Sequence, residues 1–145
     1  MHEIIFHSMA SRGLDQEGLL EIVATARKNN AEKDVTGCML YYKGEFLAIH
    51  EGKKEVLLQM HDKIARDVRH DNFTTLYIKP ISERTFASFS MAFLCLDPGC
   101  TRQDLISKEQ FAELLNTMRN KSTAKQLFIL ISENIIDSCK RHLTP

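Results

Sequence analysis

Residues 35–50 read VTGCMLYYKGEFLAIH, and the fold follows from this stretch. It holds two runs rich in β-branched, aromatic and other apolar residues, 35–42 and 45–50, with only Lys43 and Gly44 between them. A two-residue connection that contains Gly accepts the positive φ of a tight hairpin turn. The stretch therefore predicts two antiparallel strands.

The second of these strands is apolar on both sides. Side chains alternate along a strand, so Phe46 and Ala48 point one way while Leu47 and Ile49 point the other. A sheet with one face in water would instead alternate apolar and polar residues. The sequence thus requires a covering layer on each face of the sheet.

Segments on either side of the hairpin supply the rest of the sheet and one layer. Residues 2–8 alternate as a strand, and Asp15 can cap a helix whose apolar residues recur at intervals of three and four. Residues 53–66 have the same helical spacing, and residues 73–81 and 87–96 have strand character. The order βαββαββ predicts an α+β, ferredoxin-like sandwich with both helices on one sheet face.

The chain after residue 97 supplies the second layer. Ser107 and Gln110 have the spacing of a capping box, and a further helix is expected to begin near Ser122 or Thr123. The broad apolar stripe of that helix either docks on the sheet or forms part of an oligomer or effector interface. We therefore divide the chain into a core of residues 1–97 and a helical extension of residues 98–145.

Composition restricts the class of protein. The 145 residues are 43% hydrophobic, which suffices for one core, and 19 Lys and Arg balance 19 Asp and Glu. A balanced charge gives no broad attraction to nucleic acid or to an anionic membrane. The sequence has neither a secretory leader nor an apolar run of membrane-spanning length, so we expect a cytoplasmic protein. The cysteines form no C-x-x-C pair and are expected to be buried, reduced thiols: Cys38, Cys95, Cys100 and Cys139.

Short strings in a fixed order resemble one known family. They are Asn29-Asn30, Val35-Thr36-Gly37, Glu51-Gly52, Asp67-Val68-Arg69-His70, Phe86 and Ser90-Met91. Their order and spacing, on the strand and helix pattern above, are similar to the BLUF family of flavin-based blue-light sensors. The extension also resembles the helix pair that short members of that family carry after the sensor core.

The resemblance implies that FAD lies between the two core helices with its ring edge toward the sheet. In the family a Tyr on the first strand gives an electron and a proton to the excited flavin, a Gln on the hairpin strand changes its hydrogen bonds, and a Met on the last strand responds. Positions that the resemblance assigns to cofactor binding are Ile22, Asn29, Asn30, Arg69, His70 and Met91.

Two positions depart from the family pattern. Phe6 stands where the resemblance places the Tyr, and Ala48 stands where it places the Gln. Phe has no O–H and is far harder to oxidise than a phenol, and a methyl group makes no hydrogen bond. We therefore expect the conventional photocycle to be absent. Flavin binding either persists in weakened form or is lost because bulky side chains close the site.

The remaining signals leave two functions open. His50 shares a strand face with Ala48 and is either a replacement polar contact to a ligand or a structural histidine. Glu51 and Asp67 are interpreted as solvated or helix-capping groups, and no catalytic motif appears, so an enzyme is not expected. The first hypothesis is a BLUF-type flavin-binding sensory or regulatory protein. The alternative is a flavin-free interaction module, and both include a homo-oligomer and a downstream effector protein as partners.

Overall fold

Five strands form one sheet in the computed structural model, which describes residues 1–97, 100 and 105–143, without the side chains of residues 142 and 143. The strands are β1 (His2–Ala10), β2 (Thr36–Tyr42), β3 (Glu45–Gly52), β4 (His70–Pro80) and β5 (Ala92–Cys95). Their order across the sheet is β4-β1-β3-β2-β5, with β5 parallel to β2 and every other pair antiparallel. The predicted α+β, ferredoxin-like order βαββαββ is confirmed.

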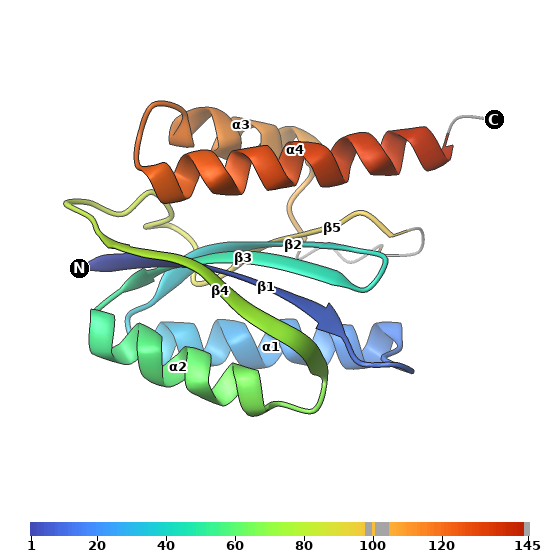
Figure 1. The fold of residues 1–145 in the computed structure, drawn as a ribbon, viewed down its shortest axis with the longest axis horizontal. Helices are drawn as coiled ribbons and strands as arrows, with labels where there is room; N and C mark the ends of the chain where they lie inside the picture. The colour runs from blue at the N-terminus through green and yellow to red at the C-terminus, as the bar shows by residue number, and fades with distance from the viewer. Residues whose placement is uncertain (98–99, 101–104, 144–145) are drawn as a thin grey trace.

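In the described part of the chain four helices cover the sheet, and Figure 1 shows how they are divided between its two faces. The helices α1 (Gln16–Glu32) and α2 (Lys54–Arg66) lie on one face, and α3 (Lys108–Met118) and α4 (Thr123–Leu143) lie on the other. Phe46 and Ala48 of β3 pack with side chains of α1, whereas Leu47 and Ile49 belong to the apolar cluster that includes Phe111 and Phe128 of the tail helices. The predicted covering of both faces of β3 is confirmed.

The helix starts follow the capping signals in the sequence. Gly18 N donates to the Asp15 carboxylate at 2.8 Å, and Ser107 and Gln110 form a full capping box. Lys125 N donates to Ser122 Oγ, so Ser122 caps α4. No helix in the described part of the chain combines the length and the apolar character that crossing a lipid bilayer requires.

The last strand is shorter than the sequence indicates. We predicted a strand over 87–96, whereas β5 contains only Ala92–Cys95. The carbonyl groups just before it are turned toward α1 and β2: Asn30 Nδ2 donates to Ser90 O at 2.7 Å, Arg27 Nε donates to Met91 O at 3.1 Å, and Gly37 N donates to Phe89 O at 3.2 Å. These groups find partners outside a β ladder, so residues 87–91 connect the sheet to α1 instead of extending it.

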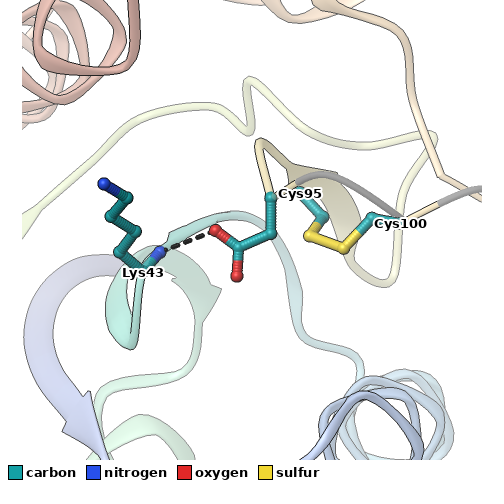
Figure 2. The surroundings of a disulfide bond; sticks show 4 residues. Lys43, Cys95 and Cys100 are labelled. Atoms are coloured by element: carbon teal, nitrogen blue, oxygen red, sulfur yellow. Dashed lines mark hydrogen bonds between the residues drawn. A yellow bond between two sulfur atoms is a disulfide. The ribbon is translucent and has the colours of Figure 1, made fainter. Parts of the chain in front are cut away.

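Two cysteines pair, which corrects the expectation of four reduced thiols. Cys95, at the end of β5, forms a disulfide with Cys100 (Figure 2). Their Cα atoms are 6.1 Å apart, within the range that a disulfide spans. Beside the bond, Lys43 N of the hairpin turn donates to the Asp97 carboxylate at 2.8 Å. Cys95 and Cys100 are five residues apart in sequence, a spacing that matches no recognised redox motif. Cys38 and Cys139 are buried and free, as expected.

A buried ion cluster joins α4 to the sheet. Glu3 and Glu51 stand opposite each other on β1 and β3 and are fully buried, and Lys125 of α4 is 3% exposed. Lys125 Nζ lies 3.2 Å from Glu3 Oε1 and 3.6 Å from Glu51 Oε2. The Glu51 carboxylate also accepts from the backbone N–H groups of Thr85 and Phe86 at 2.8 and 2.9 Å. The interpretation of Glu51 as a solvated or capping group is therefore wrong.

Removal of the Lys125 ammonium would leave two carboxylates buried without their cation. We expect K125M to lower the free energy of unfolding by about 3–5 kcal/mol, the usual cost of deleting one partner of a buried ion pair. Urea denaturation followed by circular dichroism measures this loss. K121M is the matched control, because Lys121 makes only a surface pair with Glu83 at 3.8 Å, and such pairs contribute about 0–1 kcal/mol. Equal losses in the two variants would contradict the structural role of the cluster.

Candidate functional site

A cleft opens between α1 and α2 on one face of the sheet. The sheet contributes Phe6, Met39 and His50 to its base, and the two helices and the segments that follow them form its walls. All six positions predicted to bind a cofactor line this cleft: Ile22, Asn29, Asn30, Arg69, His70 and Met91. Residues far apart in sequence are thus brought to one place by the fold.

The cleft has an apolar base and a cationic rim. Phe6, Met39 and Met91 are at most 3% exposed. Lys63 is exposed at the opening, and Lys33 and Arg69 are half-buried beside it. The enclosed volume is about 130 Å³, below the several hundred Å³ of typical small-molecule sites. The cleft is therefore narrow in this structure.

The two asparagines at the end of α1 have different surroundings. Asn29 is exposed, whereas Asn30 is 1% exposed and donates through Nδ2 to Ser90 O. This hydrogen bond holds the segment before Met91 against α1. Asn30 therefore positions one wall of the cleft in addition to lining it.

The basic pair after α2 is held by local partners. Arg69 makes a two-pronged contact with Asp67, with Nη2 2.7 Å from Oδ2, and hydrogen bonding to Arg69 lowers the pKa of Asp67. His70 is buried, and its Nδ1 lies 2.9 Å from Ser8 Oγ on β1. Burial lowers the pKa of His70. Asp67 comes directly after α2, and its ion pair with Arg69 orients the Arg69 side chain at the cleft.

The two positions that the resemblance predicts to depart from the family pattern lie side by side at the middle of the sheet. Phe6 on β1 pairs in register with Ala48 on β3, and both are at most 1% exposed. The Phe6 ring stacks on Phe73 with centroids 5.0 Å apart. None of the three tyrosines of the sequence is among the residues that line the cleft.

A buried histidine pair stands next to Phe6. His50 on β3 and His61 on α2 are 1% and 4% exposed, and His50 Nδ1 lies 3.3 Å from His61 Nε2. Burial lowers the pKa of His50 to about 4, and burial together with His50 lowers the pKa of His61 to about 3, so both rings are neutral near pH 7. The alternation of side chains along the strand had indicated that His50 lies on the same face as Ala48. No sequence signal identified His61, because its helix position is meaningful only once α2 is placed on the sheet.

Solved structures with a similar fold include BlrP1 and BlrB, the second of which is described as a BLUF protein. A structure of BlrP1 from Klebsiella pneumoniae, a calcium and cyclic diGMP complex, matches with a TM-score of 0.72 and 24% identity over 99% of this chain and 36% of that chain. BlrB in its dark state matches with a TM-score of 0.64 and 25% identity over 81% of this chain and 93% of that chain. These likenesses show the fold.

Curated relatives match part of this chain. The beta subunit of photoactivated adenylate cyclase from Euglena gracilis is 32% identical over 85 residues, which is 59% of this chain and 10% of that protein. The blue light- and temperature-regulated antirepressor BluF of Escherichia coli (strain K12) is 31% identical over 71 residues, 49% of this chain and 18% of that protein. The chain therefore spans less than a fifth of the length of these two relatives.

The family model described as sensors of blue-light using FAD matches residues 1–92. This range contains β1 through α2, β4 and the cleft that they form. With well over half of its residues matched to that model, the chain belongs to the BLUF family.

Proposed function

We propose that this chain is a BLUF-type sensory or regulatory protein that binds FAD in the cleft between α1 and α2 and lacks the conventional photocycle. The observation that supports it best is the meeting of all six candidate residues at one cleft with an apolar base and a cationic rim. In this proposal residues 1–97 are the sensor core and residues 98–145 are the extension. The protein acts in the cytoplasm, through a homo-oligomer or a downstream effector protein, and without enzymatic activity of its own.

The side chains of the cleft suit a flavin chemically. Ile22 and Met91 offer apolar surface to a planar ring, and Lys33, Lys63 and Arg69 offer charges to a phosphate-bearing tail. The narrow volume means that side chains must move for the ring to enter. Thioethers adapt readily because Met is unbranched and flexible, so Met39, Met60 and Met91 can make that room.

A bound flavin would supply absorption of blue light. This chain's residues hold the ring and exclude water from it, but the benzyl ring of Phe6 has no proton to give. The methyl group of Ala48 cannot exchange hydrogen bonds with the ring edge. Excitation therefore produces no lasting change in hydrogen bonding through these two positions.

A second candidate function rests on how tightly the cleft is packed. Phe6 stacks on Phe73 and meets His61 edge-on at 5.0 Å, which fills space below the ring site. This packing favours a flavin-free interaction module that keeps the BLUF fold. Colourless protein that fails to titrate with FAD yet forms a defined oligomer would support this alternative over the first.

The first prediction here concerns light. Purified protein incubated with FAD is expected to retain flavin that denaturation releases, and its absorbance after blue light is expected to show no reversible red shift. The double variant F6Y/A48Q restores the phenol and the carboxamide and is expected to gain such a shift. Absorbance spectra in the dark, after illumination and during recovery measure both results. A reversible shift in the unaltered protein would overturn the assignment of Phe6 and Ala48.

The second prediction concerns acid. His50 and His61 have pKa values near 4 and 3 when folded and about 6.5 when unfolded, so the unfolded state binds more protons below pH 6.5. Stability is therefore complete above that pH and is lost as pH falls toward 3. Each histidine contributes about 2 kcal/mol of this loss by pH 5, or about 4 kcal/mol for the pair.

Urea unfolding of the wild type and of H50Q/H61M at pH 7, 6 and 5 measures this dependence. The variant is expected to lose about 4 kcal/mol less than the wild type on going from pH 7 to pH 5. His70, whose pKa burial also lowers, stays in the variant and leaves a smaller dependence. Parallel pH profiles for the two proteins would show that the pair is not buried in neutral form.

A further inference from the structure

One unpaired polar atom is available to a ligand at the base of the cleft. His50 Nδ1 faces His61, which leaves His50 Nε2 buried without a hydrogen-bond partner. Among the buried side-chain atoms that lack partners in the described residues, it alone belongs to a residue that lines this cleft. A buried nitrogen without a hydrogen-bond partner is destabilising, and a suitable ligand atom would relieve that cost.

The contact to His61 determines whether that nitrogen donates or accepts. A neutral imidazole carries one N–H, so a histidine that accepts at Nδ1 must hold its proton on Nε2. When His61 Nε2–H donates to His50 Nδ1, His50 Nε2–H is a donor without a partner in the protein. When His50 Nδ1–H donates to His61 instead, His50 Nε2 is a bare acceptor.

We propose that the His50–His61 pair is the polar contact to the edge of the bound ring, with a polarity that reverses when the ring is reduced by two electrons. The inference rests on the proposed binding of flavin. The oxidised ring presents a bare edge nitrogen that needs a donor, and the reduced ring presents N–H, which needs an acceptor. A histidine pair meets both needs, which the methyl group of Ala48 cannot.

The reversal balances when the ring takes up two electrons and one proton, which gives the singly protonated, anionic reduced ring. The two electrons come from dithionite, which is oxidised to sulfite. One proton passes from His50 Nε2 to the ring nitrogen, one crosses from His61 Nε2 to His50 Nδ1, and one reaches His61 Nδ1 from water. Both histidines are neutral before and after. The rings packed around the pair are Phe6 and Phe73, and the other titratable groups of the cleft are Lys33, Lys63, Asp67, Arg69 and His70.

The ring nitrogens report the reversal directly. In protein labelled with ¹⁵N-histidine and loaded with FAD, NMR distinguishes a protonated ring nitrogen from a bare one. We expect His50 Nε2 to be protonated with oxidised FAD and bare after anaerobic reduction with dithionite. Unchanged protonation of His50 between the two states would overturn the proposal. This measurement needs no substitution, so it is independent of whether variants fold.

Affinity tests the contact itself. H50L is expected to weaken binding of both oxidised and reduced FAD by at least about fivefold, and H50Q, whose carboxamide both donates and accepts, by less than about threefold. H7L is the matched control, because His7 pairs with Glu45 outside the cleft. An H50L variant that binds FAD as tightly as the wild type does would overturn this inference but not the proposed function. Absence of FAD binding to the wild type in either oxidation state would overturn both the inference and the proposed function.

Discussion

The whole molecule depends on one strand that is buried on both faces. β3 lies at the centre of the sheet, and its alternating residues are apolar in both directions. Each face must therefore be removed from water by its own layer, because neither can be left exposed at acceptable cost. The helices α1 and α2 meet this need on one side and form the cleft between them. The helices α3 and α4 cover the other face of the sheet (Figure 1).

The same strand carries Ala48, one of the two positions predicted to depart from the family pattern. Ala48 pairs with Phe6, the other such position, across β3 and β1, so the two are neighbours in space. Two residues further along the same face, His50 places a polar group at the base of the cleft and pairs with His61 of α2. Two neutral imidazoles therefore lie beside these two positions.

Two adjacent residues of β3, His50 and Glu51, contact the layers on opposite faces of the sheet. His50 points into the α1–α2 side, whereas Glu51 points to the other side and meets Lys125 of α4. A buried carboxylate with backbone donors and a buried ammonium has few alternative arrangements, since any unpaired charge there is costly. The cleft and α4 thus contact adjacent residues of β3, whose register the neighbouring strands hold.

The sequence by itself determined the order of the elements, the three layers and the capped starts of α1, α3 and α4, because apolar periodicity and capping residues are local signals. The resemblance to the family also pointed to six residues that the fold places at the cleft, and it predicted Phe6 and Ala48 as departures from the family pattern. Only the tertiary structure decided the length of β5, whose expected first half is held by side chains of α1, and the Cys95–Cys100 bond. It also revealed the burial of Glu51 and the contact of His50 with His61. These features depend on groups from separate elements meeting at hydrogen-bonding distance, and no local pattern in the sequence encodes such a meeting.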